Sequence, residues 1–183
     1  MYKVIINVTI VIITISVLSG CYSVPHKHID GKSISANSGV LIVGLHVNKL
    51  HPFVTKPSIT FNKIRKPKNH SIINTKKYTR LFFEKTDSYA VIELPAGNYV
   101  FHRLMLSSYI TIDKTTFTIK PNKINYIGDI QANFYIDAKW WGPVYIGVKA
   151  KDRTAAAKNH MKTNYPKLYS SYPMSKYIIP VFR

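Results

Sequence analysis

Few side chains in this chain could carry out chemistry. The 183 residues include one cysteine, seven histidines and eight acidic residues, against 26 lysines and arginines. The chain contains no Gly-x-Ser-x-Gly, His-Glu-x-x-His, glycine-rich phosphate loop or cysteine-histidine pair. A glycosidase needs two carboxyl groups in a cleft, but the only glutamates, Glu84 and Glu93, are expected within strands or at their ends. The sequence therefore indicates a protein that is not an enzyme.

The histidines and tryptophans favour structural roles. His46 and His102 occupy alternating strand positions, which is typical of partly buried structural histidines. His26 and His28 form a His-x-His pair, but two ligands on a flexible segment make a weak metal site, so we predict no metal and no other cofactor. Trp140-Trp141 could stack on a carbohydrate or peptide ligand, although an aromatic plug closing one end of the domain is favoured.

The single cysteine follows an apolar N-terminal run. Lys3 precedes the mainly apolar segment Val4 to Val17, and Leu18-Ser19-Gly20-Cys21 ends it. The run is too short to span a bilayer, which takes roughly 20 apolar residues. Leu18-Ser19-Gly20-Cys21 resembles the lipobox of bacterial lipoproteins. The resemblance implies that the signal peptide 1–20 is cleaved between Gly20 and Cys21, and that Cys21 carries a diacylglyceryl group and usually a further acyl chain.

The lipobox resemblance also implies a location. In Gram-negative lipoproteins an aspartate after the cysteine favours the inner membrane, and here that residue is Tyr22. The implied location is the inner leaflet of the outer membrane, facing the periplasm, or the cell membrane in a Gram-positive host. Because a lipid-modified thiol cannot form a disulfide, core packing alone has to hold the folded domain together.

Positive charge is unevenly distributed along the chain. The net charge is +18, and no acidic residue occurs between Asp30 and Glu84. Basic surfaces attract phospholipid head groups, lipopolysaccharide phosphates or acidic proteins, whereas the export signal argues against nucleic acid. The alternative is that these lysines only solvate loops. The candidate anionic-ligand patch consists of Lys63, Arg65, Lys66, Lys68, Lys76, Lys77 and Arg80.

The elements that must position these residues are mostly short strands. We expect residues 21–38 to form a lipidated flexible tether and residues 39–183 to form one domain. Val40 to Val47 predicts a central strand covered on both faces. Pro95-Ala96-Gly97-Asn98 predicts a hairpin turn with Gly97 at positive φ. Further strands are expected at 58–64, 78–84, 89–94, 99–106, 115–120, 124–136 and 144–148.

Two features concern the second half of the chain. The even-numbered residues from Ile124 to Ile136, other than Gly128, are expected to share one face of a long strand. Asp152 is a suitable N-cap for a helix over about residues 153–164, ended by Pro166, with residues 169–182 extended or forming an edge strand. The helix should bury Ala157, Met161, Tyr165 and Leu168. Seven to nine strands and one C-terminal helix predict a mainly β fold, an antiparallel Ig-like sandwich.

A second resemblance concerns two segments. Glu93 to Val100 and Phe117 to Ile130 resemble the Leu-Pro-x-Gly-x-Tyr and Phe-x-Val-x-x-Gly-x-x-Tyr-x-Gly patterns of transthyretin-like (prealbumin-like) sandwich domains, which include a group of uncharacterised bacterial lipoproteins. Asn122 stands where glycine is common, and asparagine also enters left-handed conformations. The resemblance implies a fold and an envelope location, but no shared activity.

Together these features predict a membrane-anchored periplasmic lipoprotein whose β-sandwich is a non-enzymatic structural or protein-interaction module of the envelope. One alternative is a binding module for lipopolysaccharide or phospholipid head groups that uses the segment Lys63 to Arg80. Another is an accessory subunit of a secretion or surface-assembly machine, which is an analogy of fold alone.

Overall fold

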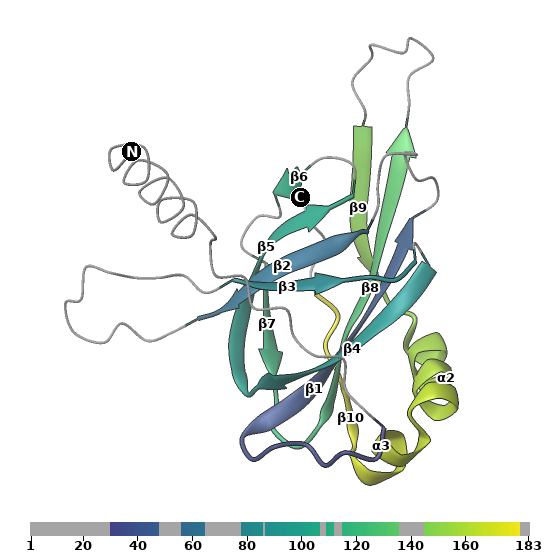
Figure 1. Ribbon diagram of the computed structural model, residues 1–183. Coiled ribbons are helices and arrows are strands. Elements are labelled where there is room, and N and C mark those ends of the chain that lie inside the picture. Colours follow the sequence, from purple (N-terminus) through teal and green to yellow (C-terminus); the bar gives the residue numbers. More distant parts are fainter. Residues whose placement is uncertain are drawn as a thin grey trace, which may run out of the picture.

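The structure is a computed structural model that describes residues 30–47, 56–64, 78–85, 87–106, 109–111, 115–135 and 145–179. Within these residues two five-stranded sheets pack face to face. Two helices cover the outer face of one of them (Figure 1). We call this sheet the helix-covered sheet and the other the open sheet. The prediction of a mainly β fold with a C-terminal helix is confirmed.

The helix-covered sheet mixes parallel and antiparallel pairs. Its order is β10-β8-β1-β4, and β9 also pairs with β8. The central strand β1 is antiparallel to β4 but parallel to β8, and β10 is also parallel to β8. The prediction of an antiparallel sandwich is therefore wrong for this sheet. The alternation of apolar and polar residues along a strand predicts which side chains are buried, but it does not predict the direction of the neighbouring strand. The strands are β1 (Ser38–Val47), β4 (Asp87–Pro95), β8 (Ile124–Tyr135), β9 (Tyr145–Lys151) and β10 (Met174–Lys176).

The open sheet is antiparallel throughout its described pairs. Its order is β3-β2-β5-β6, and β7 also pairs with β5. The described residues thus form ten strands, slightly more than the predicted seven to nine, and the shortest, β6 and β10, have three residues each. The strands are β2 (Ser58–Lys63), β3 (Thr79–Phe82), β5 (Gly97–Met105), β6 (Tyr109–Thr111) and β7 (Thr116–Ile119).

The predicted hairpin between β4 and β5 is wrong. β4 pairs with β1 in the helix-covered sheet, whereas β5 pairs with β2 in the open sheet, so the turn carries the chain from one sheet to the other. The turn residue itself is as predicted, since Gly97 has φ +142°. The turn residues predict that the chain reverses direction. They do not predict that the two strands on either side of the turn pair with each other.

Two apolar cores lie on the two faces of the helix-covered sheet. The core between the sheets includes Phe61, Tyr99, Phe101 and Phe117, whose ring centroids lie 4.9 to 6.1 Å apart. The second core joins the opposite face of that sheet to the helices. Strand β1 contributes to both cores, so its predicted burial on two faces is confirmed.

Strand β8 does not keep one face throughout. Tyr126 pairs with Ile42 but Asp129 pairs with Gly44, so β8 carries one extra residue there, and Gly128 has φ +104°. Such a β-bulge exchanges the faces of the residues that follow it. The predicted common face is therefore wrong. Before the bulge Ile124 and Tyr126 face the helices, and after it Ile130 and Ala132 face the core between the sheets.

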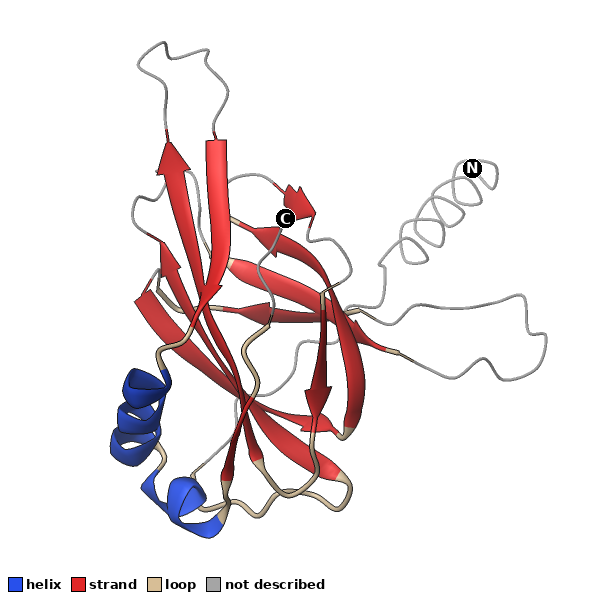
Figure 2. Cartoon of the chain, turned by 180° about the vertical axis from the view of Figure 1, so that it is seen from behind, coloured by secondary structure: helices blue, strands red, loops and turns tan. Residues whose placement is uncertain are grey.

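The helical layer consists of α2 (Thr154–Asn164) and α3 (Pro166–Ser171) (Figure 2). The cap position of α2 is Arg153, but the carboxylate of Asp152 still accepts the backbone N–H of Thr154 at 3.0 Å. Pro166 does follow the end of α2, but it also opens α3, which the sequence analysis missed. β10 confirms the expected edge strand beyond it. The predicted buried stripe is confirmed at Ala157, Met161, Tyr165 and Leu168.

The segment before β1 packs against the domain. Asp30 Oδ1 accepts the backbone N–H of Leu168 at 2.9 Å, and Ser35 donates its N–H to Glu93 Oε1 at 2.8 Å. Ile34 is buried in the core beneath the helices. Residues 30–38 therefore belong to the domain, which leaves residues 21–29 for the predicted tether.

Candidate functional site

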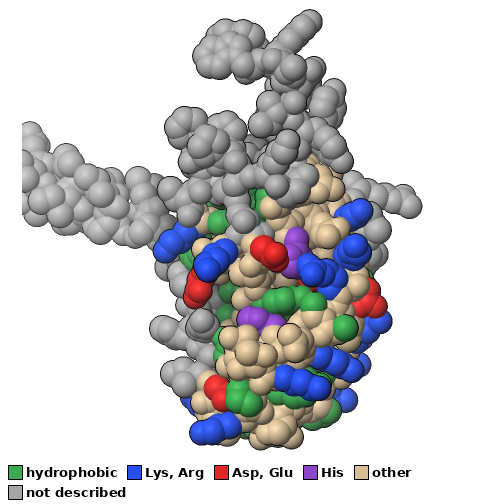
Figure 3. All heavy atoms as spheres, turned by 90° about the vertical axis from the view of Figure 1, so that its right-hand side faces the viewer, with side chains coloured by type: hydrophobic (Ala, Val, Ile, Leu, Met, Phe, Trp, Pro, Cys, Tyr) green, Lys and Arg blue, Asp and Glu red, His purple; other side chains and the backbone are tan. Residues whose placement is uncertain are grey.

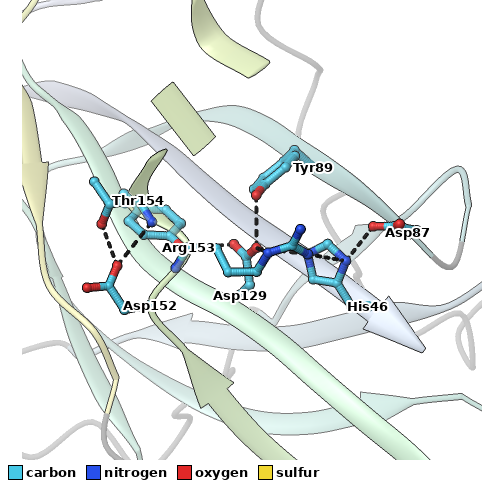
Figure 4. Close-up of polar contacts among 8 residues, drawn as sticks. His46, Asp87, Tyr89, Asp129, Asp152, Arg153 and Thr154 are labelled. Atoms are coloured by element: carbon cyan, nitrogen blue, oxygen red, sulfur yellow. Dashed lines mark hydrogen bonds and ion pairs between the residues drawn. The ribbon is translucent and has the colours of Figure 1, made fainter. Parts of the chain in front are cut away.

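A buried polar cluster lies where β1, β4 and β8 meet the start of α2 (Figure 4). Its centre is Asp129, whose side chain is 0% exposed. The hydroxyl of Tyr89 donates to Asp129 Oδ2 and that of Tyr126 to Oδ1, each at 2.8 Å. His46 Nε2 lies 2.8 Å and Arg153 Nε 3.8 Å from Oδ2. The carboxylate is thus surrounded by groups of the protein itself. We call these five residues the Asp129 cluster.

The bulge in β8 and a glycine in β1 make room for this carboxylate. Asp129 follows Gly128 and pairs with Gly44 on the neighbouring strand. A Cβ atom at Gly44 would lie 2.4 Å from Asp129 Oδ1, which is closer than real Cβ contacts allow. The glycine within the apolar run of β1 is therefore a requirement for burying the aspartate of β8.

His46 links the cluster to the protein surface. Its Nδ1 contacts the carboxylate of the exposed Asp87, while its Nε2 contacts buried Asp129. Arg153 Nη1 lies 3.0 Å from Nδ1 and 2.9 Å from Nε2 of the same ring. The imidazole is only 13% exposed. Both ring nitrogens are therefore engaged within the protein.

The two tyrosines remain hydrogen-bond donors. Burial, reinforced by the hydrogen bond to Asp129, raises the pKa of Tyr89 well above its usual value. Burial also raises the pKa of Tyr126, with the hydrogen bond to Asp129 adding to the effect. Tyr126 in turn accepts the backbone N–H of Arg153 at 3.0 Å. A buried carboxylate is tolerated when such donors and a cation surround it.

The contacts of the Asp129 cluster stabilise the fold. A histidine beside a carboxylate can act as a general base when one ring nitrogen reaches a substrate. Here both nitrogens of His46 contact carboxylates, and Arg153 lies against the ring. These contacts connect the bulge of β8 to β1, to β4 and to Arg153, the residue directly before α2.

A cleft of about 540 Å³ opens beside the cluster. Tyr89 belongs to both, and the ring of His160 on α2 lies 4.8 Å from the Tyr89 ring. Two of the acids in the cleft already serve the fold, since Asp30 accepts N–H groups of α3 and Asp87 contacts His46. The described part of the chain brings together no group of three metal-ligating side chains. The cleft is lined by Asp30, Glu84, Lys85, Asp87, Ser88, Tyr89, His160, Asn164 and Tyr165.

Several residues that the sequence analysis selected lie outside the described residues. The lipidation site Cys21, the cleavage position Gly20, the histidine pair and Trp140-Trp141 are among them. Of the candidate anionic-ligand patch, only Lys63 and Arg80 are described. The patch members outside the described residues are Arg65, Lys66, Lys68, Lys76 and Lys77.

Lys63 and Arg80 do not lie together on one face of the open sheet. Arg80 pairs with Thr60, three residues before Lys63, so the two basic side chains leave β2 and β3 on opposite faces. The guanidinium of Arg80 donates to Ser58 Oγ at 3.0 Å and lies 4.9 Å from the centre of the Phe82 ring. Arg80 is thereby held against the sheet, whereas Lys63 is exposed at the end of β2.

The histidines on the strands are partly buried, as predicted. His46 belongs to the Asp129 cluster, and His102 on β5 contacts the side chain of Asn62 and the ring of Tyr78. No sequence motif singled out Asp129, Tyr89 or Arg153. A usable signal was present, because Asp129 interrupts the apolar run of β8 and Gly44 interrupts that of β1.

Comparisons with protein-family models, curated proteins and solved structures found no match to this chain. No helix among the described residues is long and apolar enough to cross a membrane. Both resemblances therefore rest on the residues quoted for them.

Proposed function

We propose that the chain is a lipoprotein anchored through Cys21, and that its β-sandwich is a non-enzymatic interaction module of the cell envelope. The carrying observation is that Leu18-Ser19-Gly20-Cys21 ends an apolar run that contains the only cysteine. The domain is also suited to this use, since its two apolar cores lie within residues 34–179 and involve no disulfide. With Tyr22 after the cysteine, we propose the periplasmic face of a Gram-negative outer membrane.

A module that binds rather than catalyses is supported by the Asp129 cluster. His46 and Asp129 are a histidine–carboxylate pair, and the partners of both lie inside the protein. Its contacts stabilise a strand junction and leave no ring nitrogen for a substrate.

The transthyretin-like assignment is part of the same proposal. Two sheets over one core and the left-handed Asn122, with φ +52° in the turn before β8, support it. The parallel pairing of β1 with β8 is the feature that a purely antiparallel pattern did not anticipate.

The test is to substitute the acylation site in the full chain. We expect Cys21→Ser to abolish labelling with radioactive palmitate and to leave uncleaved or mislocalised precursor. Ser19→Ala, which keeps a small residue before the cleavage position, serves as the matched control and should be labelled normally. Palmitate labelling that survives Cys21→Ser would show that the lipobox reading is wrong.

A further inference from the structure

A second surface feature lies where residues 31–33 meet α3. A hollow of about 420 Å³ is lined on one side by residues 31–33 and on the other by Lys167, Leu168 and residues 170–172. We call it the α3 hollow. Lys32 and Lys167, which are far apart in sequence, are both exposed at it. Serine hydroxyls from both walls accompany them.

The hollow is built by specific contacts. Asp30 accepts the N–H of Leu168 at 2.9 Å, and Ile34 donates its N–H to the hydroxyl of Tyr172 at 3.1 Å. These two bonds fix both ends of the segment that forms the first wall. Gly31 has φ +85°, and Lys167 Cδ would lie 3.1 Å from a Cβ placed there, so the stem of Lys167 runs close along this wall.

The only charged side chains among the lining residues of the α3 hollow are two lysines. None of its lining residues is acidic, and among the described residues neither Lys32 nor Lys167 forms an ion pair. The acid closest in sequence, Asp30, directs its carboxylate to backbone N–H groups of α3. On the face that Figure 3 shows, lysine and arginine side chains are spread among polar, apolar and a few acidic side chains.

Two ammonium groups in one depression suit a phosphate group, because ammonium groups bind phosphate oxygens through charge-assisted hydrogen bonds. The hydroxyls of Ser170 and Ser171 already donate to the carbonyl oxygen of Lys167, at 3.0 and 2.8 Å, so the two lysines carry the recognition. The chain also places this depression near the membrane in the proposed lipoprotein. Eight residues separate Cys21 from Asp30, and they reach at most about 30 Å when fully extended.

We propose that the α3 hollow binds the phosphate of an anionic phospholipid head group, so that the end of the domain bearing α3 rests on the membrane. This inference rests on the proposed lipid anchor. The anchor holds the domain beside the bilayer and so raises the local concentration of lipid at a site of modest intrinsic affinity. It assigns lipid contact to Lys32 and Lys167, which are not members of the patch from Lys63 to Arg80.

The experiment uses the unlipidated fragment from Ser23 to Arg183, which retains every residue of the two cores. Co-sedimentation is measured with vesicles of phosphatidylglycerol and phosphatidylcholine, and with phosphatidylcholine alone. We expect binding to the anionic vesicles only, weakening as salt is raised. Lys32→Gln with Lys167→Gln should weaken that binding by roughly 10- to 30-fold, since each lysine at a membrane surface contributes a several-fold factor.

The matched control removes the same charge elsewhere. Lys85→Gln with Lys149→Gln changes two exposed lysines outside the α3 hollow, and we expect less than about a threefold effect, as for general electrostatic attraction. Equal losses in the two double variants would overturn the assignment to the hollow. Stabilisation of the fragment by inorganic phosphate without vesicle binding would overturn the lipid assignment. Neither result would touch the palmitate test at Cys21, so the two proposals fail separately.

Discussion

The Asp129 cluster and the α3 hollow use charged and hydroxyl side chains in opposite surroundings. In the cluster, a fully buried carboxylate receives two tyrosine hydroxyls, a histidine and an arginine from the protein itself. In the hollow, Lys32 and Lys167 are exposed and no acid lines the wall. A buried charge has to be satisfied within the fold, whereas an exposed charge contributes little to stability and remains available to a ligand.

Both regions belong to the same helical layer. Arg153, directly before α2, completes the Asp129 cluster, and α3 forms one wall of the hollow. One end of the layer thus stabilises the sheet, and we propose that the other end recognises the membrane. Substitutions in each region test this division of roles, when both the free energy of unfolding and the binding to vesicles are measured.

The largest effect is expected from removing the buried carboxylate. Asp129→Ala leaves the donors of Tyr89, Tyr126 and His46 and the charge of Arg153 without their acceptor, so the free energy of unfolding should fall by about 3 to 5 kcal/mol. Urea unfolding of the fragment from Ser23 measures it. Asp152→Ala, at an exposed carboxylate that pairs with Lys176, is the control and should have a much smaller effect. An unchanged midpoint of urea unfolding for Asp129→Ala would mean that the Asp129 cluster does not stabilise the fold.

The next effect concerns the space that the carboxylate occupies. Gly44→Ala places a methyl group against Asp129 Oδ1, and overpacking of this kind lowers the free energy of unfolding by about 1 to 3 kcal/mol. The same unfolding experiment applies. Combined with Asp129→Ala, the added methyl group should cost little more, because residues in direct contact are not additive. Strict additivity of the two substitutions would contradict the proposed close approach.

Alkaline pH offers a milder test. The pKa values of Tyr89 and Tyr126 are raised in the folded protein, so their contribution to stability is fully present below the ordinary tyrosine pKa of about 10 and is lost as pH rises above it. We expect the free energy of unfolding to fall as pH rises above about 10, and to fall less steeply in Tyr89→Phe. Parallel profiles for the two proteins would show that Tyr89 does not stay protonated in the fold. Burial also raises the pKa of Tyr99 to about 12, which adds to the common background slope.

The smallest effect on stability is expected at the α3 hollow. Lys32→Gln with Lys167→Gln should change the free energy of unfolding by no more than about 0.5 kcal/mol, as for other exposed positions, although we expect it to weaken vesicle binding. Thermal melts of the fragment provide the measurement. A loss of stability comparable to that of Asp129→Ala would make the lysines part of the structure, and the contrast between the two regions would disappear.

Local pattern predicted much of the domain correctly. The strands β1 and β7 and the buried stripe of α2 all follow from periodicity and composition. Periodicity carries this information because burial alternates with the geometry of each element. It failed in β8, where the bulge at Gly128 exchanges the two faces, and in β4 and β5, where a turn that reads as a hairpin crosses between sheets.

By itself, the sequence determined most of the strands, the helix α2, the positive φ of Gly97 and the excess of positive charge. It did not predict α3 or β6, and Cys21 as an anchor remains a prediction. Only the tertiary structure decided whether paired strands run parallel or antiparallel. It also decided which residues come together in the Asp129 cluster and in the α3 hollow. His46 and Asp129 are 83 positions apart, and Asp30 and Leu168 are 138 apart. Contacts at such separations depend on how whole sheets and helices pack, and a local pattern contains no information about that packing.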